Sequence, residues 1–173
     1  EGIPDDAFAP ISGDDKVFAR SLKRQNRQER TGQMSMFGDL REQPQISYQA
    51  VTEQTVELSA IAESSLQAVR EKSARYQAIL ESDIYGQAKM AADAWCAAFL
   101  WRKTVDAAVP VTEELFRRMK ADPASVPETA RDEIRQLAEQ YYFFHWHLAF
   151  PDVFRVPGEG EQPECAACGS FFI

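Results

Sequence analysis

The sequence predicts a mainly α-helical protein, a bundle-like module with a long helix and helical hairpins that ends in an extended aromatic segment. Three observations predict this fold class. Patterns typical of β-strands are nearly absent before residue 143. Apolar residues recur at helical spacing over residues 52–82, which predicts one long amphipathic helix. Helix start and stop residues bracket four further segments.

The first of these segments, residues 14–31, predicts a helix with a basic stripe. Asp14 and Asp15 suit its positively polarised start, and Val17, Phe18 and Leu22 are its expected apolar anchors. Spacings of three and four residues place six cations along one side of the helix. These candidate DNA-binding residues are Lys16, Arg20, Lys23, Arg24, Arg27 and Arg30.

Two interpretations of the basic stripe stay open at this point. It is either a solvated helix face or a face that contacts nucleic-acid phosphates. The net charge of −8 argues against a nucleic-acid footprint over the whole surface but leaves room for a local one. Gln25, Asn26 and Gln28 have side chains of the kind that read base edges, and the sequence does not choose among them.

The later helices differ in how deeply they should be buried. Residues 83–101 are apolar almost all round after Lys89, so this helix should pack against several neighbours. Thr112 is the predicted N-cap of a short helix that ends before residue 122. Ser125 and Glu128 predict a capping box that opens a helix reaching about Tyr142.

Residues 141–154, YYFFHWHLAFPDVF, concentrate aromatic side chains in one short run. Pro151 favours an extended conformation before it. The run is expected to dock onto another layer as a hydrophobic plug, with its two histidines hydrogen-bonded at the interface and binding no metal. The candidate interface residues are His145, Trp146, Phe150 and Phe154.

Several stretches are familiar. In chain order they are IPDDAF at residues 3–8, the basic LKRQNRQER with GQMSMF at 22–37, ADAWCAAFLW at 92–101 and FFHWHLAFPDVF at 143–154. Together they resemble a segment of large adenine-specific DNA methyltransferases. This family includes the fused type IIG restriction–modification methylases and the related methylases of bacterial phage-defence islands. The resemblance covers residues 3–157.

The resemblance implies a helical module within a larger α/β enzyme that transfers a methyl group from S-adenosylmethionine to the amino group of adenine. The family's Asn-Pro-Pro-Tyr or Asn-Pro-Pro-Trp catalytic loop does not occur in these residues. Its glycine-rich cofactor loop is echoed only by CAACGSFFI at 165–173, which lacks the leading Asp-Pro. We therefore assign no catalytic and no cofactor-binding residue. S-adenosylmethionine is expected as the cofactor of the parent enzyme, and DNA and the rest of the methyltransferase as partners.

Three weaker inferences complete the sequence-based prediction. Cys165 and Cys168 form a lone C-x-x-C, which is too few ligands for a closed zinc site, so no metal site is assigned. No apolar run approaches the ~20 residues that span a bilayer, so we expect no membrane partner and a cytoplasmic location. A non-enzymatic helical interaction or oligomerisation protein is the alternative function.

The expected domain organisation has three parts. Residues 1–47 should form an N-terminal loop, the basic helix and a linker, and residues 48–157 a helical module that ends in the aromatic segment. Residues 158–173 should form a flexible tail.

Overall fold

The computed structural model describes residues 2–32, 48–151 and 153–154, and in these ranges the chain is helical without strands, as predicted. The described residues form two compact units. Unit 1 contains residues 2–32 and 83–145. Unit 2 contains residues 48–82, 146–151 and 153–154. The predicted tail at 158–173 and the predicted linker after residue 32 lie outside the described residues.

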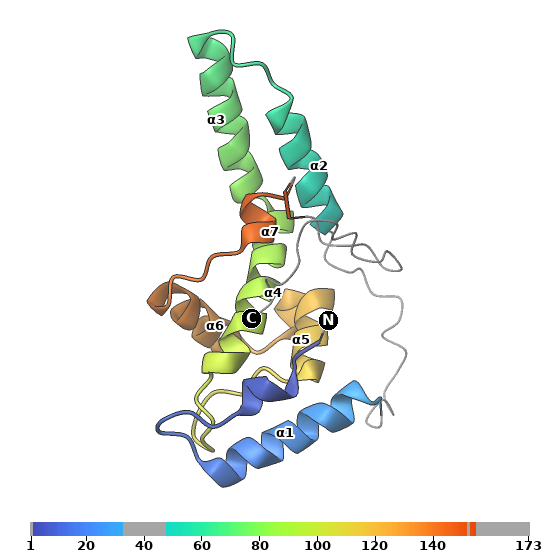
Figure 1. The fold of residues 1–173 in the computed structure, drawn as a ribbon, viewed down its shortest axis with the longest axis vertical. Helices are drawn as coiled ribbons and strands as arrows, with labels where there is room; N and C mark the ends of the chain where they lie inside the picture. The colour runs from blue at the N-terminus through green and yellow to red at the C-terminus, as the bar shows by residue number, and fades with distance from the viewer. Residues whose placement is uncertain (1, 33–47, 152, 155–173) are drawn as a thin grey trace. The chain divides into compact units, whose positions relative to one another are not determined.

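Unit 1 is built around one central helix. Helix α4 (Asp83–Leu100) packs against α5 (Glu113–Ala121), α6 (Glu128–Gln140) and the short 3-10 helix η1 (Asp5–Phe8). Helix α1 (Lys16–Arg30) packs against η1 and α5, so that one of its sides faces the unit and the other faces outward (Figure 1). A second 3-10 helix, η3 (Pro123–Ser125), connects α5 to α6.

Small side chains explain why α4 can sit at the centre. Five of its alanines are almost fully buried, which lets neighbouring backbones approach closely, and this confirms the expected burial. The large rings of the core lie around them, with Trp101 donating from its indole nitrogen to the Ala108 carbonyl over 3.0 Å. The buried core includes Ile3, Phe8, Leu22, Trp101, Met119 and Ile134.

A buried ion pair holds the start of α1. The Asp14 carboxylate accepts hydrogen bonds from the backbone of Ile11 and Lys103, both at 2.9 Å, and the Lys103 ammonium lies 3.5 Å away. Burial lowers the pKa of Lys103, against the opposing influence of Asp14. Burial alone would raise the pKa of Asp14, but the two backbone donors and the Lys103 charge bring it below its ordinary value. Asp15, next in sequence, caps the helix by accepting from the amides of Val17 and Phe18.

Two predicted helix caps are wrong. The Thr112 side chain makes no cap hydrogen bond to α5. The predicted capping box is not formed either, because the Ser125 hydroxyl donates to the Asp122 carbonyl and α6 starts directly after Pro127 without a side-chain cap. The amides at the start of α5 are satisfied from α1, as described below.

The end of α6 has an unusual backbone. Tyr142 adopts a left-handed conformation with φ of 53°, and the Phe143 amide donates back to the Ala138 carbonyl over 3.0 Å. This pattern is a Schellman-type helix end, whose left-handed position is normally occupied by glycine. The predicted stop near residue 142 is therefore confirmed, and its conformation carries backbone strain.

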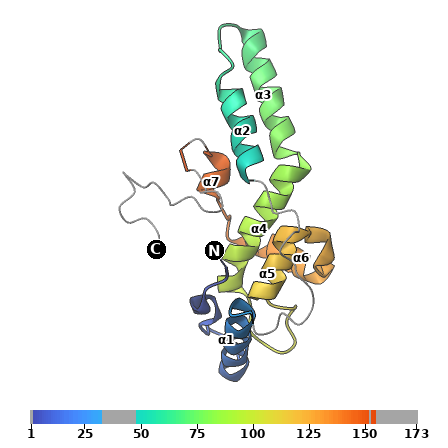
Figure 2. The ribbon, with the colours of Figure 1, turned by 90° about the vertical axis from the view of Figure 1, so that its right-hand side faces the viewer.

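Unit 2 is a helical hairpin with one further turn of helix. Helices α2 (Tyr48–Ser59) and α3 (Leu66–Leu80) lie side by side, as Figure 1 and Figure 2 both show. The single long helix predicted over residues 52–82 is therefore wrong, since residues 60–65 break it. The Ser65 hydroxyl accepts from the Ala68 amide over 3.1 Å and starts α3 anew, a local side-chain bond that competes with a continuous helix.

The aromatic segment also differs from the extended conformation expected for it. Residues Trp146–Ala149 form the short helix α7, which packs beside α2. The amides of Phe150 and Phe154 donate to the carbonyls four residues before them, at 2.8 and 2.9 Å. Turn-like geometry thus occurs at Pro151 and again at Val153 and Phe154.

Candidate nucleic-acid interface

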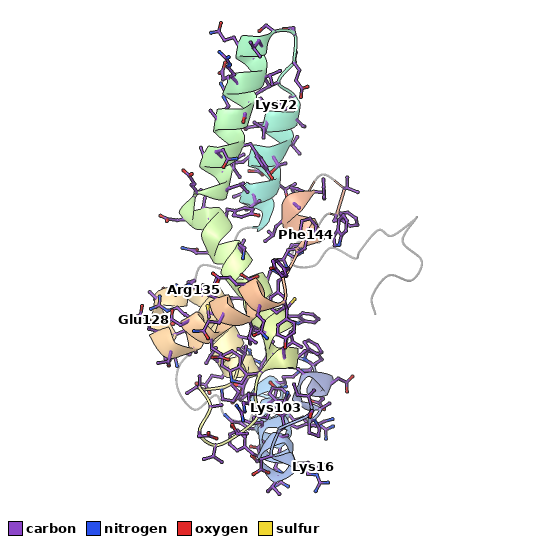
Figure 3. All side chains as sticks on the ribbon, turned by 90° about the vertical axis from the view of Figure 1, so that its left-hand side faces the viewer. Lys16, Lys72, Lys103, Glu128, Arg135 and Phe144 are labelled. Carbon is purple, nitrogen blue, oxygen red and sulfur yellow. The ribbon has the colours of Figure 1, made fainter. Side chains whose placement is uncertain are left out.

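The predicted basic stripe lies on the outward side of α1. Consecutive residues of an α-helix are about 100° apart, so the six cations fall within an arc of about 120°. Lys23 is half-buried and the other five are exposed. Lys16 lies at the edge of unit 1 in Figure 3, while Lys103 lies farther inside. Against these six cations, the helix contains one carboxylate, Glu29, which is buried on the opposite side.

One of the six cations has a partner inside the unit. Arg27 forms a close ion pair with Asp5 of η1. Among the described residues, no carboxylate pairs with Lys16, Arg20, Lys23, Arg24 or Arg30. Within the described part of the chain, these five charges can therefore meet an external anion, and arginine binds both phosphate and carboxylate groups in two-point geometry.

A buried polar network fixes the orientation of α1. Asn26 is fully buried, donates to the Ile3 carbonyl over 2.9 Å and accepts from the Glu113 amide over 2.8 Å. Glu29 accepts from the next amide of α5, that of Glu114, over 2.9 Å. Side chains of α1 therefore cap the first turn of α5 in place of Thr112.

The carboxylate of Glu113 completes this network. It accepts from the Ile3 amide over 2.7 Å and from Arg117 over 3.1 Å. Arg117 also donates to the Glu29 carbonyl over 3.2 Å. Because the side chains of Asn26, Glu29 and Glu113 all have hydrogen-bond partners, the network holds α1, α5 and the segment at Ile3 in one arrangement.

The network corrects two sequence-based expectations. Asn26 was one of three candidates for reading base edges, and its burial excludes it. Val17 was an expected apolar anchor, yet it is 73% exposed, and Ala19 takes its place on the buried side. The signal for this face was present in the sequence, because Ala19, Leu22, Asn26 and Glu29 repeat at helical spacing. Two of the four are polar, which concealed the pattern.

The predicted interface residues divide between the two units. His145 belongs to unit 1, where its Nε2 lies 2.7 Å from the buried carboxylate of Asp93. Lys89 donates to the other oxygen of this carboxylate over 2.6 Å. Sequence reasoning missed Asp93, although a carboxylate within an otherwise apolar helix is a signal that it has buried partners.

Trp146, Phe150 and Phe154 form the aromatic cluster of unit 2. The Trp146 ring centroid lies 5.8 Å from the centroid of each phenylalanine ring, and Trp146 is 58% exposed. These ring contacts gather the side chains of α7 and of the turns that follow it into one cluster. In unit 1, Tyr141, Tyr142 and Phe144 are also exposed.

Other chemistry has little support in the part of the chain that the structure describes. No group of three or more potential metal ligands occurs there, and the C-x-x-C at 165–168 lies outside it. Burial, reinforced by the nearby charge of Asp93, raises the pKa of the Cys96 thiol, which disfavours the nucleophilic thiolate. None of the described helices is long and apolar enough to cross a bilayer.

Neither a protein-family model, a curated protein nor a solved structure matches the chain.

Proposed function

We propose that the chain is a helical module of an S-adenosylmethionine-dependent, adenine-specific DNA methyltransferase of the restriction or phage-defence type, and that α1 contacts the DNA backbone. The observation that carries the proposal is the exposed arc of cations on α1, whose opposite side is locked onto η1 and α5. The sequence resemblance supplies the reaction class. The module itself supports the catalytic domain and performs no chemistry.

A salt titration tests the DNA contact. The full 173-residue chain is titrated into a fluorescently labelled duplex of mixed sequence, and anisotropy is recorded over a range of salt concentrations. Binding should weaken steeply with salt, because each neutralised phosphate releases counterions and adds about 0.9 to the slope of log K against log salt. Replacing both Arg20 and Arg30 with glutamine should reduce that slope by about 2.

The matched control removes the same charge elsewhere. Arg70 and Arg135 are exposed on α3 and α6, and replacing both with glutamine changes the net charge equally. This control should bind the duplex as the unchanged chain does. If both double variants lost the same DNA affinity, net charge alone would explain the effect and α1 would have no particular role. An absence of duplex binding at low salt would refute the proposal.

The methyltransferase assignment is tested separately. Genomic DNA on the two sides of this reading frame should encode the S-adenosylmethionine loop and an Asn-Pro-Pro-Tyr or Asn-Pro-Pro-Trp loop. The purified chain should transfer no labelled methyl group from S-adenosylmethionine to DNA. Methyl transfer by the chain on its own would contradict a purely supporting role, and flanking DNA without either loop would contradict the family.

One observation favours a second candidate function. The aromatic cluster of unit 2 exposes large rings, as protein–protein interfaces of helical adaptors do. A non-enzymatic interaction or oligomerisation protein would use these rings to bind a partner chain. A homodimer of fixed molecular mass in solution would favour this alternative.

A further inference from the structure

The outermost row of α1 overlaps its cation arc only at Arg24. Val17, Ser21, Arg24 and Gln28 follow one another at intervals of four, three and four residues, and all four are exposed. At about 100° per residue, they lie within a strip about 60° wide, about 150° away from the centre of the buried face. This row is therefore the part of α1 that a body approaching unit 1 from outside would meet first.

The remaining cations flank this row on one side. Lys16, Arg20, Lys23, Arg27 and Arg30 fall within an adjacent arc of about 80°. A helix that lies in a groove of DNA turns its outermost row toward the bases and its flanks toward the phosphates of the groove walls. The outer row and the one basic flank of α1 correspond to base contacts and to phosphate contacts along one wall of the groove.

The residues of the outer row have the chemistry of direct base readout. Arginine donates two hydrogen bonds to guanine, glutamine forms a bidentate pair with adenine, and an apolar side chain contacts the methyl group of thymine. Among the described residues, no hydrogen-bond partner holds the Gln28 side chain, whereas Gln25 is bound to Glu29 over 2.8 Å. The Ser21 hydroxyl donates to the Phe18 carbonyl over 2.7 Å, so it is bound within the helix. Ser21 is therefore a small residue of the row, between Val17 and Arg24.

The width of α1 also agrees with that of a DNA groove. An α-helix with its side chains is about 10–12 Å wide, and the major groove of B-form DNA is about 12 Å wide. The major groove of double-stranded RNA is too narrow to be read by side chains. The outer row lacks the aromatic residues on which single-stranded bases stack. Duplex DNA is therefore the nucleic acid that this row fits.

We infer that α1 is a recognition helix, which enters the major groove of duplex DNA and contacts base edges through Val17, Arg24 and Gln28. This inference rests on the proposed function, since it specifies what the same helix reads. Val17 and Gln28 are about 16 Å apart along the helix axis, so the readout extends over at most about five base pairs.

Selection from a randomised duplex library by the full chain tests the inference. The unchanged chain should enrich a short motif. Replacing Val17 and Gln28 with alanine should leave the salt dependence of binding to mixed DNA unchanged, because no cation is removed. The preference for the motif over mixed DNA should fall about tenfold or more. The control replaces Val69 and Gln67, exposed residues of the same types on α3, and should keep the full preference.

Each outcome is decisive. Enrichment of no motif, despite salt-dependent binding of duplex, would refute the recognition helix and leave the backbone contact intact. A motif preference that survives in the Val17 and Gln28 double variant would also refute it. Binding to single strands or to RNA in preference to duplex DNA would do the same. A chain that binds no duplex at any salt concentration would refute the proposed function as well.

Discussion

Asn26 is the residue on which the position of α1 depends most directly. It satisfies both the Ile3 carbonyl and the Glu113 amide within a closed environment. Asn26→Ala leaves both groups buried without a partner, so we expect the free energy of unfolding to fall by about 3 kcal/mol. Urea unfolding followed by circular dichroism measures this loss.

The control for Asn26 lies two residues farther along the same helix. Gln28→Ala removes an exposed amide side chain and should change the free energy of unfolding by less than about 0.5 kcal/mol. Similar losses in the two variants would show that the buried network contributes nothing particular to stability.

Asp14 makes stability depend on pH. Its folded-state pKa lies below the ordinary value of 3.8, so its contribution is present above pH 3.8 and is lost as the pH falls through the folded value. At pH 7, Asp14→Asn leaves the buried Lys103 without a counter-charge and should cost about 3 kcal/mol. The cost should shrink in acid, where the unchanged chain also loses the carboxylate charge.

Urea unfolding at pH 7 and near pH 3 measures this difference for Asp14→Asn. Asp132→Asn is the control, because Asp132 pairs with Arg135 on the exposed side of α6 and should lose about 0.5 kcal/mol or less. A cost for Asp14→Asn that is the same at both pH values would exclude the carboxylate charge as its cause.

Among the elements, the turn that ends α6 contains strain that a single substitution should relieve. Tyr142 holds a left-handed conformation, is 88% exposed and therefore contributes little packing. Tyr142→Gly should raise the free energy of unfolding by about 1 kcal/mol, because glycine adopts this conformation without steric cost. Thermal unfolding measures the gain as an increase in Tm.

The neighbouring residue provides the opposite expectation. Tyr141 has a negative φ of −103°, so glycine brings no relief there and adds backbone entropy to the unfolded chain. Tyr141→Gly should therefore lower the Tm. A decrease in both variants would show that the Tyr142 side chain contributes more than its backbone strain costs.

The elements also show where sequence reasoning succeeds and where it stops. Helices α1 and α4 follow from local signals, namely the acidic start and charge spacing of α1 and the apolar run of α4. Helices α5 and α6 were placed correctly as well, although the side-chain caps expected for them do not form. After the break at 60–65, α3 starts with a local cap in which the Ser65 hydroxyl accepts from the Ala68 amide, and the apolar spacing does not reveal it. The capping of α5 by Asn26 and Glu29 joins residues more than 80 positions apart, and no local pattern specifies such a pairing.

The candidate interface likewise has features that the sequence predicts and features that only the fold shows. The basic stripe could be predicted because charge spacing on a helix is local, and its outward direction could not, since that depends on which side α5 and η1 cover. Only the fold distinguishes the three amide side chains of α1. Asn26 is buried, Gln25 is hydrogen-bonded to Glu29, and Gln28 is exposed. The chemistry of side chains is legible in the sequence, but their accessibility is a property of the packing.

For the whole molecule, the exposed rings predict its behaviour in solution. Trp146, Phe150 and Phe154 present apolar area to water in unit 2, so we expect light scattering to show nonspecific association that grows with protein concentration. Replacing Phe150 and Phe154 with serine should lower the weight-average mass toward that of the monomer. Multi-angle light scattering after size exclusion measures this mass.

Val105 and Val109 provide the control for the rings. They are exposed apolar residues outside the aromatic cluster, and their replacement with serine should leave the association unchanged. A homodimer of fixed mass that the Phe150 and Phe154 double variant converts to a monomer would instead favour the oligomerisation protein. A monomer at all concentrations would contradict both expectations for these rings.

The dependence of α5 on side chains of α1 has a practical consequence for anyone who wishes to transplant the basic helix. Fifteen residues are too few to stay helical in water without tertiary support, and here that support comes from a neighbour more than 80 positions downstream. A synthetic peptide copied from residues 16–30 should therefore be largely unstructured. A graft of this helix into another scaffold must also provide the first turn of a neighbouring helix, whose backbone amides donate to Asn26 and Glu29.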